Sequence, residues 1–383
     1  MKKTKICKSK EETYYIKNKG IPKGCKYCLN GAKTVLFLNG ICQNPNHCRW
    51  YCPISEERKN KEFTYANEIQ INNKEQLLEE INLTRAKGMS ITGGDPLFEP
   101  NLDKTLSYIK YIKKKKGKKF HIHLYTNGLN FNASIAQKLS DVGLDEIRFN
   151  PPNDKWNIIE SALEKGFKVG AEVPVIPSRD YISNLERFIY YLDRIGADFI
   201  NLNEFEMCVT NSDSLKEKGF KLKKGTIASV ENSREFALKL IKKVINKVSL
   251  KIHFCTIIAK DYWQLSKRYS RRAKSIKKPY ELITEDGLLW FAQIEGNIEK
   301  LKNFYDTLSE MIKNPSNRIK FENNMIKLPL KYMIRKEITN LLQNYTLKAY
   351  IVEKTPFKDE KYAQITEKIP LNVFMEEKGY NFD

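Results

Sequence analysis

Gly40-Ile41-Cys42-Gln43-Asn44-Pro45-Asn46-His47-Cys48-Arg49-Trp50-Tyr51-Cys52-Pro53 places three cysteines directly after an apolar run, residues 35–38. Three thiolates on one loop can hold three irons of a cubane cluster and leave the fourth iron open for a ligand that is not protein. His47 could in principle replace one thiolate. A zinc site or three unliganded thiols would be the plainer explanation, but zinc loops more often pair cysteines as CX2C to CX4C within four ligands. We therefore expect a [4Fe-4S] cluster on Cys42, Cys48 and Cys52.

A second motif follows about forty residues later. Residues 89–96 read Met-Ser-Ile-Thr-Gly-Gly-Asp-Pro, a short strand that ends in two glycines and an acid. Glycines at such a position let the backbone approach a small ligand closely. In order and separation, the two motifs resemble those of the radical S-adenosylmethionine (SAM) superfamily. The resemblance implies that the cluster binds SAM, with Tyr51 before the third cysteine and with Gly93, Gly94, Asp95 and Pro96 around the SAM amino group.

The cysteine spacing departs from the usual pattern of that superfamily. Its members commonly show CX3CX2C, whereas this loop reads CX5CX3C. A closer resemblance, over about the first three quarters of the chain, is to archaeal radical SAM proteins related to pyruvate formate-lyase activating enzymes. It rests on the segments 23–28, 31–33, 51–55 and 65–68.

Strand and helix patterns alternate from residue 33 to about 255, which predicts an α/β fold with a parallel sheet. The resemblance implies a partial (β/α) radical SAM barrel of about six strands. We expect an N-terminal segment with CxxC (1–32), the barrel (33–260), and a basic helix with a small C-terminal α+β domain (261–383). The strand patterns lie near 33–39, 89–92, 119–125, 145–149, 168–175, 198–203 and 248–254.

Polar and apolar residues alternate along five of these strands. The apolar set should face the surrounding helices, and the polar set should face the interior, which would then hold water or ligand. Thr126 and Asn127 resemble the position from which the superfamily often contacts the SAM ribose. His121 and His123 could transfer protons or be wall residues. The interior residues that we expect on the cofactor side are Arg148, Glu172, Asn201 and Asn203.

Cys25 and Cys28 form a CX2C pair, half of a common metal site. With Cys255 and either His253 or Cys208, they could close a second site for zinc or an auxiliary iron–sulfur cluster. The pair precedes the first strand while Cys255 ends the last one, so the N-terminal segment would have to loop upward and return.

The chain has 67 Lys and Arg against 46 Asp and Glu, a formal net charge of +21. Such a charge favours an anionic partner, such as RNA, a phosphorylated metabolite or a lipid surface. A genome that is AT-biased or comes from a hot environment would give abundant lysine without any such partner. On a helix, Lys267, Arg271, Lys274 and Lys278 would share one face, broadened by Arg268 and Arg272. With aromatic residues nearby, this face would suit RNA or another phosphate-bearing substrate. No stretch approaches the roughly 20 apolar residues of a membrane-spanning helix, so we expect a cytoplasmic protein.

The C-terminal part reads strand (287–294), helix (297–313), strand (318–328), helix (330–344), strand (346–353) and a tail. No cysteine follows Cys255, which excludes a C-terminal domain with extra cysteine-bound clusters.

The resemblance thus implies an enzyme that takes electrons from a ferredoxin or flavodoxin type donor, cleaves SAM reductively and abstracts hydrogen from its substrate. The net charge favours an anionic substrate, with RNA the leading candidate. Two alternatives stay open. One is an activating enzyme that places a glycyl radical on a partner protein. The other is an iron–sulfur or zinc protein that binds nucleic acid and performs no radical chemistry.

Overall fold

Seven parallel strands stand side by side in the computed structural model, which describes residues 5–378. They follow one another across the sheet in chain order, which is one strand more than the sequence resemblance implied. All seven lie where the alternating pattern predicted strands. Their bounds are β3 Lys33–Phe37, β6 Gly88–Thr92, β7 His121–Thr126, β8 Glu146–Phe149, β9 Lys168–Val175, β10 Phe199–Glu204 and β11 Lys251–Cys255.

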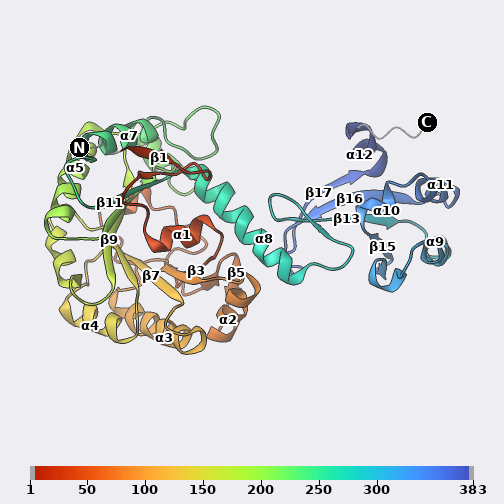
Figure 1. The fold of residues 1–383 in the computed structure, drawn as a ribbon, viewed down its shortest axis with the longest axis horizontal. Coiled ribbons are helices and arrows are strands. Elements are labelled where there is room, and N and C mark those ends of the chain that lie inside the picture. Colours follow the sequence, from red (N-terminus) through yellow and green to blue (C-terminus); the bar gives the residue numbers. More distant parts are fainter. Residues whose placement is uncertain (1–4, 379–383) are drawn as a thin grey trace. The chain divides into compact units, whose positions relative to one another are not determined.

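Helices connect these strands and line the outer side of the curved sheet (Figure 1). The connection from β8 to β9 is a short 3₁₀ helix instead. Helix α5 shows why such segments pack there, because Leu185, Phe188, Ile189 and Leu192 recur at helical spacing and are buried. The connecting elements are α2 Lys74–Leu83, α3 Glu99–Lys116, α4 Ala133–Asp141, η2 Trp156–Ala162, α5 Arg179–Arg194, α6 Ser212–Glu217 and α7 Ser233–Val244.

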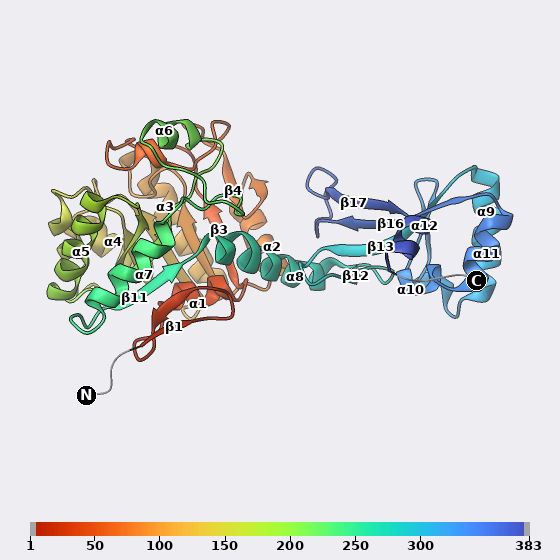
Figure 2. The ribbon, with the colours of Figure 1, turned by 90° about the horizontal axis from the view of Figure 1, so that it is seen from above.

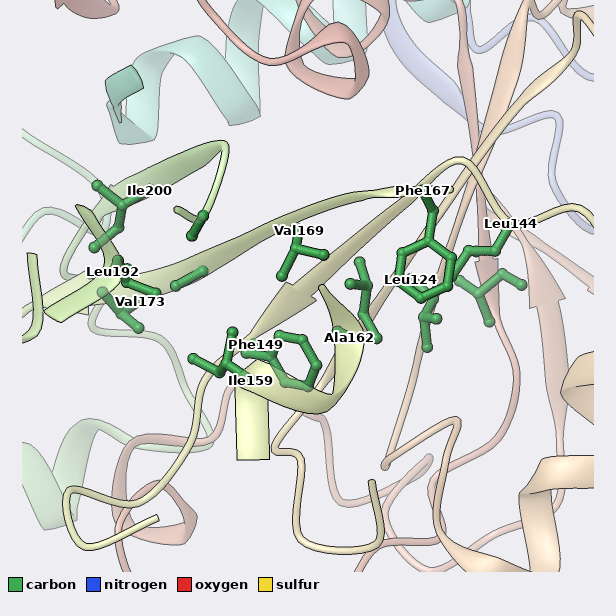
Figure 3. Close-up of a cluster of buried hydrophobic side chains, with 14 of the residues drawn as sticks. Leu124, Leu144, Phe149, Ile159, Ala162, Phe167, Val169, Val173, Leu192 and Ile200 are labelled. Carbon is green, nitrogen blue, oxygen red and sulfur yellow. The ribbon is translucent and has the colours of Figure 1, made fainter. Parts of the chain in front are cut away.

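Apolar side chains fill the space between the sheet and these helices (Figure 3). Leu124 of β7, Phe149 of β8 and Ile200 of β10 have no exposed surface. They pack in the same cluster as Ile159 of η2 and Leu192 of α5. The apolar half of the alternating pattern therefore faces the helices, as predicted.

Two antiparallel hairpins extend the sheet, one at each edge. At one edge of the sheet, next to β3, lie β4 Thr64–Ala66 and then β5 Ile69–Ile71. At the other edge, next to β11, lie β2 Tyr14–Ile16 and then β1 Ile6–Lys8. The register of β2 against β11 pairs Tyr15 with His253. The N-terminal hairpin thus carries the chain past the last parallel strand before α1 (Lys23–Leu29) enters the concave side of the sheet (Figures 1 and 2).

Helix α1 lies on the concave side of the sheet (Figure 1), in the interior that the strand pattern predicted, and contacts β3, β6 and β7. The interior is therefore partly filled by the protein's own N-terminal segment, and the expectation of an interior given over to water or ligand was wrong for that part. Gly24 allows the close approach, since a Cβ there would lie 2.7 Å from Glu146 Oε1. The backbone N–H of Gly24 donates to Glu146 at 3.2 Å.

Residues from Ser266 onward form a second compact unit, beginning in α8 (Leu265–Ile276), which directly follows the π-helical turn η3 (Ala259–Gln264). Its antiparallel sheet has the order β14-β15-β13-β16-β17, and β12 pairs with β13. The strands are β12 Leu282–Ile283, β13 Leu289–Glu295, β14 Lys320–Glu322, β15 Met325–Leu328, β16 Lys348–Lys354 and β17 Ile365–Pro370. The helices are α9 Ile298–Met311, η4 Pro315–Asn317, α10 Leu330–Met333, α11 Lys336–Asn344 and α12 Leu371–Glu377.

Three features of this unit differ from the sequence interpretation. The segment 318–328 is a hairpin, because Asn323 and Asn324 adopt positive φ angles of 52° and 54°, which suit a tight two-residue turn. The segment 330–344 is two helices, α10 and α11. The expected tail contributes β17 and α12.

Candidate functional site

A cavity of about 320 Å³ lies at the carboxyl end of the parallel strands. It brings together every residue that the sequence placed at the cluster or the cofactor, except Asn201. The lining includes Cys42, Cys48, Tyr51, Cys52, Gly93, Gly94, Asp95, Pro96, Thr126, Asn127, Arg148, Glu172 and Asn203.

The three-cysteine loop is held by tight turns. Pro45 O accepts hydrogen bonds from the backbone N–H groups of Cys48 and Arg49, at 3.1 and 3.0 Å, before the 3₁₀ turn η1 (Arg49–Tyr51). The extra residues of the CX5CX3C spacing are thereby folded into turns, and all three thiols still line one cavity.

The donor set fits an iron–sulfur cluster. Burial raises the pKa of Cys42 and Cys52, and for Cys48 burial together with the neighbouring Cys42 and Cys52 raises the pKa to about 12. All three thiols line the same cavity, and bound iron would replace their protons. Asn127 Nδ2 lies 3.9 Å from Cys42 Sγ and can donate to the thiolate.

Gly93 and Gly94 make room for protein backbone as well as for ligand. The backbone N–H of Gly94 donates to Asn39 O at 2.7 Å, and that of Asp95 donates to Ile41 O at 3.1 Å. A Cβ on Gly94 would collide with the backbone of Ile41, whose N would lie only 2.8 Å away. The two glycines therefore allow the start of the cysteine loop to pack closely against the end of β6.

Asp95 is 2% exposed, and both its carboxylate oxygens are engaged by the protein. They accept hydrogen bonds from Leu97 N (2.8 Å), Asn127 N (2.7 Å) and Thr126 Oγ1 (3.0 Å). Burial raises the pKa of Asp95 to about 6, against the lowering effect of these hydrogen bonds. Contact between Asp95 and the SAM amino group stays a prediction, whereas its role in joining two loops is visible directly.

Tyr51 lies between the cavity and an aromatic cluster. Asn150 Nδ2 donates to its hydroxyl at 3.1 Å, and its ring packs at 5.8 Å from that of Phe205. The adjacent Trp50 stacks on Phe220 with ring centroids 6.1 Å apart and an interplanar angle of 16°.

These aromatic contacts come from the covering segment, residues 205–232, which joins β10 to α7. The sequence placed the turn after Asn203 near the site but did not predict that this segment packs on the cysteine loop. Asn211 ties it to the cysteine loop, since its Nδ2 donates to Tyr51 O at 3.0 Å. The available signal was length, because ordered loops longer than about 12–15 residues are usually functional. The segment brings Phe205, Glu206 and Asn211 to the cavity wall.

His47 points away from the thiols. Its Nε2 lies 2.9 Å from Asn150 O, and its ring lines a separate cavity of about 220 Å³. It does not line the cavity of the three cysteines, so its substitution for a thiolate finds no support.

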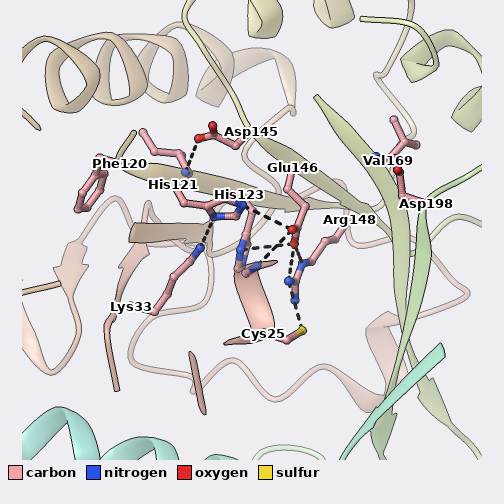
Figure 4. Close-up of polar contacts among 12 residues, drawn as sticks. Cys25, Lys33, Phe120, His121, His123, Asp145, Glu146, Arg148, Val169 and Asp198 are labelled. Carbon is pink, nitrogen blue, oxygen red and sulfur yellow. Dashed lines mark hydrogen bonds and ion pairs between the residues drawn. The ribbon is translucent and has the colours of Figure 1, made fainter. Parts of the chain in front are cut away.

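A chain of buried ionic groups lies under α1 (Figure 4). Lys33 Nζ donates to His121 Nδ1 at 2.9 Å, and His121 Nε2 faces Glu146 Oε2 at 3.5 Å. Arg148 Nε donates to Glu146 Oε1 at 2.8 Å. Burial lowers the pKa of Lys33 to about 8. Although burial opposes it, Arg148 and His121 hold the pKa of Glu146 well below its usual range.

Arg148 also pairs with Glu172, which accepts from Asn203 Nδ2 at 3.0 Å. Because its guanidinium already pairs with two carboxylates, Arg148 is more a support for the wall than a free cofactor ligand. His121 and His123 line neither the 320 Å³ cavity nor a smaller cavity of about 80 Å³ that is described below. Burial lowers the pKa of both histidines. Their surroundings are those of wall residues.

A cavity of about 80 Å³, the lower cavity, contains the remaining predicted residues, Cys25, Cys28, Asn201, His253 and Cys255. Among residues 5–378, no three His, Cys, Asp or Glu side chains are arranged to hold a metal ion, so a zinc site here is not supported. Cys208 belongs to the covering segment, with Sγ 3.2 Å from Thr210 Oγ1, and does not line the lower cavity. As an alternative ligand it was wrong.

The expected basic face of α8 is only partly available. Arg272 is 4% exposed, and its Nε donates to Pro356 O at 2.8 Å. Its guanidinium lies over the Phe357 ring. Arg272 therefore holds the second unit together and does not broaden an RNA-binding surface. Within the described part of the chain, none of the helices combines the length and apolar character that a bilayer crossing demands.

Comparison with known proteins agrees with this geometry. Residues 15–155 match the family model described as Radical SAM superfamily. A Methanocaldococcus jannaschii protein, named as a candidate glycyl-radical enzyme activating enzyme, is 37% identical over 371 residues, which span 92% of this chain and 93% of that protein.

Likeness to solved structures is distant. Streptococcus suis SuiB bound to SAM gives a TM-score of 0.40 at 13% identity over 59% of this chain, and this chain spans about half of SuiB (50%). Coproporphyrinogen III oxidase (HemN) from Escherichia coli, a radical SAM enzyme, gives 0.32 at 9% identity, covering 71% of this chain and 83% of that one. The family match and the extended similarity to the archaeal relative, on a chain whose three cysteines and Gly-Gly-Asp turn share one cavity, show that the chain belongs to the radical SAM superfamily and is a radical SAM enzyme.

Proposed function

We propose that this enzyme activates a partner protein by placing a radical on a glycine residue. The observation that carries the proposal is the 37% identity to the M. jannaschii relative over nearly the whole of both chains. The curved parallel sheet, within residues 33–260, would serve as a partial radical SAM barrel, and the residues from 261 onward as a smaller domain.

In this proposal Cys42, Cys48 and Cys52 ligate the [4Fe-4S] cluster. A cluster held there would supply the chemistry of reductive SAM cleavage and of hydrogen abstraction from the substrate. Gly93, Gly94 and Pro96 form the turn beside SAM, while Asp95 fixes the loop that carries Thr126 and Asn127. A ferredoxin or flavodoxin type protein would donate the electron.

The chain's own residues favour a dry, fixed cavity. Tyr51 and the aromatic rings of the covering segment close one side, and paired ions rather than free charges form the wall around Arg148. Exclusion of solvent protects a reactive radical from side reactions. The RNA interpretation rested on net charge and on α8, and Arg272 of that helix is buried.

The test follows deuterium from substrate to 5′-deoxyadenosine. Reconstituted enzyme, reductant and SAM are mixed with total protein from cells of the source organism grown on Cα-deuterated glycine. We expect deuterium in 5′-deoxyadenosine, measured by mass spectrometry, and a glycyl signal in electron paramagnetic resonance spectra.

Two matched controls decide the outcome. In the first control, total cell protein without deuterium is mixed with ribose-deuterated RNA, and no deuterium should reach 5′-deoxyadenosine. In the second, the Cys48→Ala enzyme should give no 5′-deoxyadenosine with either substrate. Transfer from RNA but not from glycine would overturn the partner-protein proposal and restore the RNA alternative. Cys7→Ser, in β1 and away from both cavities, should behave like the unaltered enzyme.

A further inference from the structure

The lower cavity gathers thiols that are far apart in the sequence. Cys25 and Cys28 lie one turn apart on α1, and Cys255 is the last residue of β11. Helix α1 contacts the turn η3 that follows β11, so the N-terminal segment does loop over the sheet and return, as a shared site requires. Cys25 and Cys255 are only 4% and 6% exposed. The three thiols therefore face a common interior space of about 80 Å³.

His253 adds a nitrogen without a partner to the same cavity. Its Nδ1 is hydrogen-bonded to Asn201 Oδ1, and because an amide oxygen only accepts, Nδ1 must carry the proton. Nε2 then holds a free lone pair. His253 is 1% exposed, and Nε2 is buried without a hydrogen-bond partner. A histidine that donates through one nitrogen and presents the other is the usual form of a metal-ligating histidine.

Donors surround the sulfur atoms. Arg148 Nη2 lies 3.4 Å from Cys25 Sγ, and Gln264 Nε2 lies 3.6 Å from Cys255 Sγ. Lys260 also lines the lower cavity. Cations and N–H groups near sulfur stabilise thiolates and set the potential of a cluster that they ligate.

The spacing of the ligands favours a cluster over a single ion. No three of these side chains are arranged to hold a single metal ion, although all four line one cavity of about 80 Å³. Cys42, Cys48 and Cys52, the predicted ligands of the first cluster, also form no group that could hold a single ion. A cluster keeps its thiolates farther apart than one ion does, so both sets of ligands suit a cluster. We propose that Cys25, Cys28, Cys255 and His253 bind a second iron–sulfur cluster in the lower cavity.

This second cluster would border the chamber in which the radical forms. The lower cavity and the 320 Å³ cavity share five wall residues: Tyr125, Arg148, Glu172, Asn203 and Lys260. A group held by α1 and β11 is therefore separated from the SAM side by side chains alone. The inference does not depend on whether the partner is a protein or RNA.

The test removes the first cluster and asks what remains. The loop variant, Cys42→Ala/Cys48→Ala/Cys52→Ala, is reconstituted anaerobically with iron and sulfide. We expect it to keep iron and acid-labile sulfide in equal amounts and to lose both when Cys25→Ser and Cys28→Ser are added. The matched control adds Cys7→Ser instead and should keep both. Circular dichroism confirms that each variant is folded.

A second variant tests the histidine. His253→Cys should retain the cluster in the loop variant but lower its reduction potential, because imidazole ligation raises the potential relative to four thiolates. A folded loop variant without iron, or one that binds zinc alone, would overturn the inference. Neither result would bear on the proposed function, which is read from SAM cleavage and deuterium transfer by the unaltered enzyme.

Discussion

Asp95 at the end of β6 accepts a 2.7 Å hydrogen bond from the backbone N–H of Asn127, which follows β7. Thr126 donates to the same carboxylate at 3.0 Å. The turn after one strand is thus fixed to the turn after the next, at the edge of the sheet where parallel barrels place their active sites.

Asp95→Asn should remove a pH-dependent contribution to stability. The folded protein holds the Asp95 proton up to a pKa of about 6, whereas the ordinary pKa is 3.8. The free energy of unfolding is therefore highest below the unfolded pKa of 3.8 and falls by about 3 kcal/mol as the pH rises to about 6. Urea unfolding of the metal-free protein and of the variant between pH 4 and 7 measures it. Identical pH slopes for both proteins would refute the assignment.

Gly94→Val should disturb the cluster as well as SAM binding. The added side chain would collide with the backbone of Ile41, next to Cys42, so the cysteine loop must shift. We expect at least a tenfold loss of SAM cleavage together with a reduced iron content. Gly196→Ala serves as the control, because its Cβ would meet nothing within 4 Å and should cost only about 1 kcal/mol from its positive φ. A full cluster in Gly94→Val would show that the glycine serves the ligand alone.

Cys48→Ala should abolish SAM cleavage, because two thiolates of the loop cannot hold the cluster with one open iron. Anaerobic reconstitution followed by chromatography of 5′-deoxyadenosine measures the loss. If the lower cavity also binds a cluster, this variant keeps part of its iron while losing all cleavage. Undiminished SAM cleavage by this variant would contradict the assignment of Cys42, Cys48 and Cys52 as the cluster ligands.

Asn211→Ala should loosen the covering segment. The amide donates to Tyr51 O and Glu206 O and accepts from Cys208 N at 2.8 Å, and it is 2% exposed. Its removal leaves buried backbone groups without partners, at about 1–3 kcal/mol. The expected readout is several-fold faster bleaching of the cluster in air.

Asn132→Ala is the matched control for Asn211. It removes a cap at the start of α4, where the side chain accepts from Ile135 N, and costs about 1 kcal/mol. Because it touches neither the cysteine loop nor the covering segment, its cluster should bleach at the rate of the unaltered protein. If the clusters of both variants bleached at the same rate, the covering segment would not be what protects the cluster from air.

The sequence by itself determined the parts that depend on neighbours along the chain. Three cysteines on one loop predict the cluster ligands, which stay a prediction. Two glycines before Asp95 and strand patterns alternating with helices predicted the turn and the parallel sheet that the structure shows. These features are local, because periodicity and spacing decide which residues share a face or a loop.

Only the tertiary structure decided the rest, because it depends on contacts between distant segments. It put α1 on the concave side of the sheet (Figure 1) and engaged both carboxylate oxygens of Asp95 with protein donors. It packed the backbone of Ile41 against Gly94. It also placed the covering segment over Trp50 and Tyr51, and Cys255 with Cys25 around one space. Side chains that meet across the sheet leave no periodic signal along the chain, so a CX2C pair alone could not show which residues complete its site.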